Sequence, residues 1–356
     1  MSEEPTIRAD NLGSFLRPPY LLQARAAQLP AAELRAVEDR AIEEVLAFQE
    51  AIGLRVLTDG EFRRRHFFST LDDVVEGLEP EGFVRHHRDE HGNLAEVRTP
   101  TPVARLQRTG YLADVELDFV KARTAREVKV TMPAPSLLSV YWSEELSPGA
   151  YATRELYREH LVELMHEDAV ELARRGAAHI QLDAPHYAYL QEVLKDTADR
   201  DAELRELVEA DNGVLRGIEG ITSGLHVCRG NMRSRFTGTE PYDGFAHSIL
   251  PFAEYDRVLL EYDDERSGGF GPLRHLREDA IAVLGLVTTK RGTMESAQEL
   301  SARVEEAAQH VPLSRLALST QCGFASNALG NEIDVAAQSA KMELVIEVAT
   351  SIWGSA

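Results

Sequence analysis

The sequence predicts an α/β protein built as a single (β/α)8 barrel, and three observations support this fold class. Helical segments fill most of the gaps between eight short strand-like runs near residues 12, 56, 129, 181, 226, 259, 284 and 317. No Gly-rich dinucleotide fingerprint follows the first run, which disfavours an open doubly wound sheet. A length of 356 residues is common for a one-domain barrel. We therefore expect a TIM barrel that forms one domain over residues 1–356.

The net charge and the hydropathy of the chain limit the kinds of molecule that the protein is expected to bind. The chain has 38 Lys and Arg against 59 Asp and Glu, a formal net charge of -21, which would repel nucleic acid and anionic membrane surfaces. No apolar run is long enough to span a bilayer, and the first residues lack the features of a signal peptide. These observations favour a cytoplasmic enzyme of small molecules that binds no nucleic acid and no membrane, with a homo-oligomer left open.

The first two predicted units are β then α. Residues 11–18 are expected to form a short strand that breaks at Gly13, and a helix is expected from Ala31 to Ile52. The second strand, residues 54–58, is followed by Asp59-Gly60-Glu61-Phe62 and by three arginines that lead into a predicted helix. Residues 83–120 then form a predicted insertion of extended pieces around a turn, similar to a hairpin.

The rest of the chain alternates regularly between strands and helices. A long helix is expected from about Tyr151 to Arg175, and a closing helix from about Asp334 to Trp353. The remaining strands are expected at residues 127–132, 179–183, 224–228, 257–262, 281–287 and 315–319.

Reactive side chains follow these strands where each strand ends. The active site of a barrel lies at the carboxyl ends of its strands, so residues from different strands meet there. Both cysteines of the chain fall at such positions, and in a reducing compartment free thiols or metal ligands are favoured over a disulfide. The residues concerned are Ser14, Asp59, Glu61, Asp183, His226, Cys228, Glu261, Lys290 and Cys322.

One imidazole and two thiols of this set suggest a metal site. His226, Cys228 and Cys322 suit zinc, and Glu261 could occupy or vacate the fourth position. Taken singly, a buried cysteine is often an inert small hydrophobic residue, and a glutamate after a strand is often a solvated anion. Their shared position at the barrel mouth favours the metal site.

Six segments in order resemble the cobalamin-independent methionine synthase family, in a short form with the catalytic barrel only. The agreement extends along nearly the whole chain. The segments are Gly13-Ser14-Phe15, Gly60-Glu61-Phe62, Gln181-Leu182-Asp183-Ala184-Pro185, His226-Val227-Cys228, Leu260-Glu261 and Gln321-Cys322-Gly323.

The resemblance implies a zinc-dependent methyltransferase with one zinc per chain and no cobalamin. The thiol of homocysteine would bind zinc as a thiolate and take the methyl group from N5 of a methyl-folate, which yields methionine. The resemblance also implies that Glu61 and Asp183 hold the substrate ammonium and that Ser14 lies near its carboxylate.

Two departures from the family pattern concern the methyl donor. Ala184 stands where the family has Glu, and Thr288-Thr289-Lys290 stands where it has an Asp-x-His used to protonate the leaving group. A folate amine is a poor leaving group unless it is protonated as the bond breaks. Lys290 and His186 are the candidate catalytic acids that could replace that histidine.

Two other functions remain open from the sequence. The first is zinc-dependent alkyl transfer with another donor or thiol, as in coenzyme M transferases, although carboxylates at Glu61 and Asp183 favour an amino-acid thiol over a sulfonate. The second is a non-catalytic zinc-binding or thiol-binding barrel, whose four ligands would form a closed site.

Overall fold

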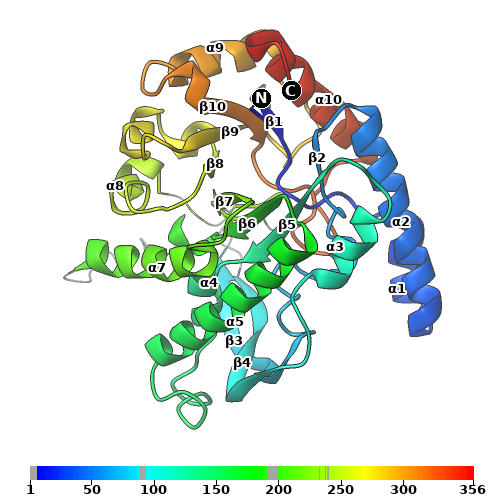
Figure 1. Cartoon of the computed structure of the whole chain (residues 1–356), viewed down its shortest axis with the longest axis vertical. Helices are drawn as coiled ribbons and strands as arrows, with labels where there is room; N and C mark the ends of the chain where they lie inside the picture. The colour runs from blue at the N-terminus through cyan, green and yellow to red at the C-terminus, as the bar shows by residue number, and fades with distance from the viewer. Residues whose placement is uncertain are drawn as a thin grey trace.

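The computed structural model describes residues 6–88, 94–188, 190, 199–231, 233–236, 238 and 240–356. Eight parallel strands form one sheet in the order β1-β10-β9-β8-β7-β6-β5-β2. Helices surround this sheet, and both chain ends lie beside β1 and α10 (Figure 1). The strands are β1 (Ala9–Asp10), β2 (Val56–Leu57), β5 (Glu127–Pro133), β6 (His179–Asp183), β7 (Thr222–Val227), β8 (Arg257–Glu261), β9 (Ile281–Val287) and β10 (Leu316–Thr320).

Helices occupy most of the connections between strands, which agrees with the predicted alternation. The longest is α5. It begins at an N-cap Thr153, whose side chain accepts a hydrogen bond from the Leu156 N–H, and it ends at Gly176 in the left-handed conformation. The helices are α1 (Pro19–Ala26), α2 (Ala31–Ala51), α3 (Asp114–Lys121), α4 (Pro135–Ser139), α5 (Arg154–Arg175), α7 (Arg200–Leu215), α8 (Ala246–Ile249), α9 (Ala297–Ala307) and α10 (Val335–Trp353).

The two ends of the sheet approach each other through side chains. β1 and β2 stand at opposite ends of the pairing order. The Asn11 Nδ2 donates to the Val56 carbonyl at 3.2 Å, and the Thr58 hydroxyl donates to the Gly13 carbonyl at 2.7 Å. The sheet is therefore a nearly closed barrel, and the predicted (β/α)8 fold is confirmed.

The strands are buried on both faces, although β5 and β6 alternate apolar and polar residues whereas β9 is apolar throughout. In β8, Val258 and Leu260 belong to the large core, whereas Leu259 packs in a small separate cluster with Val283 and Ala317. Arg257 and Glu261 have the same parity as Leu259, so they share its face of the strand. The face that carries Glu261 is thus apolar at its centre and polar at its ends.

A buried ion network occupies the start of the strands. The Lys129 Nζ lies 2.6 Å from the Asp10 Oδ1, and an Arg257 Nη lies 3.1 Å from the Asp10 Oδ2. The Lys129 ammonium also donates to the Gln181 Oε1 at 3.1 Å. Three strands are thereby tied to β1 by charge-assisted hydrogen bonds.

An antiparallel hairpin of β3 (Val75–Arg88) and β4 (Leu94–Arg108) follows β2. It extends away from the parallel strands beside α5 (Figure 1). The predicted hairpin-like insertion is confirmed, although the hairpin begins at Val75 rather than near residue 83. Helix α3 occupies the end of the predicted range 83–120.

Two local predictions were wrong. The first strand is Ala9–Asp10 and not residues 11–18, because the Asn11 Oδ1 accepts a hydrogen bond from the Gly13 N–H, and Gly13 has a φ of 116°. The residues after Arg65 form turns and not a helix. There the Ser69 hydroxyl accepts hydrogen bonds from the Arg65 and His66 N–H groups, which competes with helix formation.

The length and hydropathy of the helices decide whether any of them could span a membrane. Among the residues that the structure describes, no helix has the length and apolar character needed to cross a bilayer.

Candidate metal centre

The four residues predicted as zinc ligands lie together at the carboxyl ends of three strands. His226 is in β7 and Cys228 directly follows that strand, Glu261 is the last residue of β8, and Cys322 follows β10. One ligand atom from each lies within 4.8 Å of all the others, and all four side chains are buried. Within the described part of the chain, this is the one group of three or more such residues that could hold a metal ion.

Several polar atoms of this cluster lack a hydrogen-bond partner in the described part of the chain, which suits a site for a cation. The His226 Nε2 and both carboxylate oxygens of Glu261 are buried without a hydrogen-bond partner among the described residues. The His226 Nε2 lies 3.6 Å from the Glu261 Oε1, and the two cysteine Sγ atoms are 3.9 Å apart. Burying polar atoms without partners raises the free energy of the folded state, and a cation bound by these atoms would lower it again. Two thiols, an imidazole and a carboxylate are a donor set that fits zinc.

The outer nitrogen of His226 is held by a carboxylate. The His226 Nδ1 donates to the Asp183 Oδ1 at 3.0 Å, and the Gln181 amide donates to the same oxygen at 2.8 Å. This arrangement orients the Nε2 toward the other three donors and is typical of metal-binding histidines. Gln181 in turn accepts from Lys129, so the support extends into the buried ion network.

The cluster holds protons when no metal is bound. Burial lowers the pKa of His226, but the hydrogen bond to Asp183 and the Glu261 carboxylate 3.6 Å from its Nε2 outweigh burial and raise the pKa to about 10. The hydrogen bond to Cys322, together with burial, raises the pKa of the Cys228 thiol well above its usual range. A dication would displace these protons, because metals bind the deprotonated forms of both residue types.

Ser14 lies against the loop that carries Cys322. Its hydroxyl accepts a hydrogen bond from the Ala325 N–H at 3.2 Å, and its carbonyl accepts from the Phe324 N–H at 2.9 Å. A Cβ atom at Gly323 would come within 2.0 Å of the Ser14 Oγ, so only glycine fits between Ser14 and Cys322. The structure thus places Ser14 beside the fourth ligand.

Glu61 occupies a strained and buried position at the end of the second unit. Its φ is 58°, in the left-handed region, and its Oε1 accepts a hydrogen bond from the Thr131 hydroxyl at 2.7 Å. The other oxygen, Oε2, is buried and unpaired among the described residues. Burial raises the pKa of Glu61, Arg64 opposes this, and the negative charges of Asp183 and Asp59 raise it further. Glu61 and Asp183 are therefore close enough for their charges to interact.

The two candidate acids have different surroundings. The Lys290 Nζ lies 2.9 Å from the Asp263 Oδ2 and 3.4 Å from the Asp264 Oδ2, so it is in a buried ion pair. His186 is fully buried, and neither ring nitrogen has a partner within the described residues. Burial lowers the pKa of His186 to about 3, which leaves its imidazole neutral at pH 7.

Arg17 supports the site, although sequence reasoning assigned it no role. Its buried guanidinium donates to the Glu61 carbonyl and to the Ala325 carbonyl, each at 2.7 Å. It thereby joins the strained loop at Glu61 to the loop after Cys322. All its recorded acceptors are backbone carbonyls, which a single sequence does not reveal.

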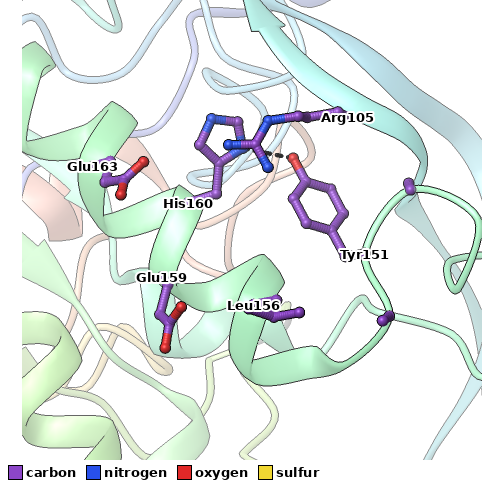
Figure 2. A pocket seen from close by; sticks show the side chains of 8 residues that line it. Arg105, Tyr151, Leu156, Glu159, His160 and Glu163 are labelled. Carbon is purple, nitrogen blue, oxygen red and sulfur yellow. Dashed lines mark hydrogen bonds between the residues drawn. The ribbon is translucent and has the colours of Figure 1, made fainter.

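A separate pocket lies between β4 and the start of α5. Figure 2 shows Arg105, Tyr151 and His160 at this pocket, with the tyrosine and histidine joined by a hydrogen bond. The Tyr151 hydroxyl lies 2.6 Å from the His160 Nδ1 and accepts from the Leu106 N–H at 2.8 Å, so its polar atom is satisfied. None of the predicted site residues lines this pocket.

Comparison with known proteins gives relatives that align over almost the whole chain. The "Uncharacterized protein YxjH" of Bacillus subtilis (strain 168) is 32% identical, over 97% of this chain and 94% of that protein. A methionine synthase of Pyrococcus furiosus is 24% identical, over 90% of this chain and 87% of that protein.

Solved structures support the same fold. The putative vitamin-B12 independent methionine synthase of Listeria monocytogenes has a TM-score of 0.75 and 26% identity, and the match covers 99% of both chains. The B12-independent methionine synthase of Shewanella sp. W3-18-1, in complex with selenomethionine, has a TM-score of 0.77 and 19% identity over 98% of both chains, which supports the fold alone.

The family model described as "Cobalamin-independent synthase, Catalytic domain" matches residues 17–349. That range includes every residue predicted for the site except Ser14. The chain therefore belongs to the cobalamin-independent synthase family, and most of its length corresponds to the catalytic domain of that family.

Proposed function

We propose that the protein is a zinc-dependent methyltransferase that methylates the thiol of homocysteine, with a methyl-folate as donor and methionine as product. The observation that carries this proposal is the buried cluster of His226, Cys228, Glu261 and Cys322, in which three polar atoms lack a partner within the described residues. The family supports a methyltransferase of the methionine synthase type.

Zinc, when bound by these four residues, would acidify a substrate thiol and keep it nucleophilic at neutral pH. Glu261 is the ligand best suited to leave as the thiol arrives. Neither of its carboxylate oxygens has a hydrogen-bond partner among the described residues, so its side chain can move without breaking one. His226, by contrast, is held through its Nδ1 by Asp183.

The substrate amino acid would bind beside Ser14, Glu61 and Asp183, which lie at or just after the ends of the first, second and fourth barrel strands in chain order. Glu61 offers its unpaired Oε2, and Asp183 adds a second negative charge, so together they suit an ammonium group. Ser14, next to the Cys322 loop, would lie near the substrate carboxylate. A sulfonate thiol would instead meet the Glu61 and Asp183 carboxylates, which favours homocysteine over coenzyme M.

Lys290 is the better of the two candidates for protonating the leaving group. Its Nζ lies at a partly buried position beside Asp263 and Asp264, and both carboxylates would orient it toward the donor. His186 remains neutral because burial lowers its pKa to about 3, so it suits hydrogen bonding at the mouth better than acid catalysis.

Alkyl transfer from a donor other than methyl-folate is a second candidate. The observation that favours it is the ion pair at Lys290, because an ammonium bound by two carboxylates replaces the histidine on which the family pattern relies for folate. The zinc cluster would serve both reactions equally.

The test measures zinc per chain and then product. Wild type is expected to hold about one zinc per chain, Cys228→Ser and Glu261→Gln much less, and the exposed control Glu265→Gln as much as wild type. Zinc-loaded protein is then incubated with homocysteine and either methyl-folates or simple methyl donors, and methionine is quantified.

Full zinc occupancy in Cys228→Ser would contradict the proposed metal site. Full zinc in wild type with methionine formed only from a donor other than a folate would favour the second candidate. Zinc that homocysteine leaves unaltered, with no product from any donor, would favour a non-catalytic metal-binding barrel.

A further inference from the structure

The hydroxyl of Tyr242 lies between the ends of β7 and β8, the strands that carry His226 and Glu261. It donates a hydrogen bond to the Val227 carbonyl and accepts one from the Glu261 N–H, each at 2.8 Å. Val227 is the residue between the two ligands His226 and Cys228. One hydroxyl therefore contacts the backbone at the segments that supply three of the four ligands.

The Tyr242 hydroxyl takes the place of one backbone hydrogen bond between β7 and β8. Val227 pairs with Leu260 in the parallel register, and the Tyr262 N–H donates to the Gly285 carbonyl of β9. Successive residues of a strand direct their backbone groups to opposite neighbours, so the backbone of Glu261 points toward β7. In a regular ladder its N–H would bond to the Val227 carbonyl directly, whereas here an oxygen atom lies between them. The two strand ends are thereby held apart at the metal cluster.

The hydroxyl of Ser267 binds the backbone carbonyl of Glu261, whose N–H is bound by Tyr242. The Ser267 hydroxyl donates to the Glu261 carbonyl at 2.7 Å, and it accepts a hydrogen bond from the Arg229 guanidinium at 3.1 Å. Arg229 directly follows the ligand Cys228. Ser267 and Arg229 are both buried. The segment after β7 and the backbone of Glu261 are thus linked on this side as well.

Packing gives the Tyr242 hydroxyl little freedom. Tyr242 begins the short helix η1 (Tyr242–Gly244), and only 1% of its surface is exposed. Its ring centroid lies 5.1 Å from that of Tyr262 and 5.4 Å from that of Phe245. A buried aromatic ring in such contacts keeps one orientation, so its hydroxyl acts as a fixed spacer.

We propose that Tyr242 is a positioning residue that sets the separation between the β7 and β8 ligands, with Ser267 as its counterpart at the Glu261 carbonyl. This inference rests on the proposed metal site. Tyr242 does not contact the metal or the substrate in this role; it acts through the backbone of Val227 and Glu261. Loss of its hydroxyl would let the strand ends close together and would misplace Glu261 relative to His226 and Cys228.

Tyr242→Phe and Tyr262→Phe form a matched pair for the test. Both remove one buried hydroxyl, but the Tyr262 hydroxyl has no hydrogen-bond partner within the described residues. Zinc release to a chelator is measured on folded protein, and visible absorption is recorded with cobalt(II) in place of zinc, because those bands report ligand geometry. Tyr242→Phe should release zinc about 10 times faster or more and shift the cobalt bands, whereas Tyr262→Phe should match wild type.

Each outcome decides between the two proposals. Equal zinc release and equal cobalt spectra for Tyr242→Phe and wild type would overturn the positioning role and leave the metal site intact. Should Tyr242→Phe fail to fold, Ser267→Ala decides, and an unchanged cobalt spectrum in that variant would overturn the role. A folded wild type that binds neither metal would overturn the proposed function and this inference together.

Discussion

Asp183 accepts a hydrogen bond from the Nδ1 of His226 at 3.0 Å, so one carboxylate belongs both to the support of the metal cluster and to the proposed ammonium site. Its negative charge also raises the pKa of Glu61, which shows that the two carboxylates lie close enough to repel each other. If the protein has the proposed function, substrate binding and metal binding would be coupled through this single side chain.

Replacement of Asp183 should weaken both sites. Asp183→Asn keeps the size of the side chain but removes the charge that orients and polarises His226, so zinc affinity should fall about 10- to 100-fold. The KM for homocysteine should rise as well. Chelator competition and steady-state kinetics measure the two effects, with the exposed Asp279→Asn as control. Unchanged zinc affinity would show that the His226 contact has no role in metal binding.

Glu61→Gln should stabilise the folded protein and weaken its binding of homocysteine. Because burial raises the pKa of Glu61, the folded state binds its proton more tightly than the unfolded state does. The free energy of unfolding of wild type should therefore fall as pH rises from the ordinary carboxyl pKa through the raised one, and Gln should remove that fall.

Glu61→Gln is therefore expected to be more stable than wild type at pH 7, with a raised KM for homocysteine. Thermal unfolding of both proteins between pH 4 and pH 8 is the measurement. Parallel pH curves for the two proteins would contradict the assignment of a buried, destabilised carboxylate to Glu61.

Lys129→Met should destabilise the barrel and should do so in a pH-dependent way. Burial alone raises the pKa of Asp10, but Lys129 and Arg257 outweigh it and lower that pKa. The stabilisation from Asp10 is therefore present above the ordinary carboxyl pKa and lost as pH falls through the lowered value. Removal of one partner of such a buried pair costs about 3–5 kcal/mol.

Chemical denaturation at pH 7 and at acid pH measures the loss from Lys129→Met, which should shrink as pH falls. The exposed Lys121→Met is the control and should cost far less. An equal loss at both pH values would indicate that Lys129 contributes by packing alone.

Lys290→Met should lower kcat with little change in the KM for homocysteine. General acid catalysis typically contributes about 100- to 10,000-fold to a rate, and a Met side chain cannot donate a proton. Single-turnover methyl transfer measures the chemical step, and the exposed neighbour variant Arg291→Met serves as control. If Lys290→Met keeps the wild-type rate, the ion pair with Asp263 and Asp264 is structural, and another group protonates the donor.

The barrel and the metal cluster could be predicted because both depend on local order along the chain. Alternating strands and helices indicate the fold, and strand ends converge, so His226, Cys228 and Cys322 could be placed together without knowledge of packing. The start of the barrel could not be placed, since the Asn11 side chain and the φ of Gly13 end the strand before residue 11. Tyr242 gave no signal, because its hydroxyl contacts only the backbone of residues distant in sequence.

The distribution of the ligands along the chain has a consequence for biosynthesis. Cys228 and Cys322 are 94 residues apart, and Cys322 follows the last strand of the barrel. A ribosome-bound chain that has not yet exposed the segment after β10 lacks one of the four donors of the proposed metal site, so tight metal binding would have to wait for that segment. Zinc would then bind tightly only to chains that include Cys322, and chains that end before this residue would not retain it.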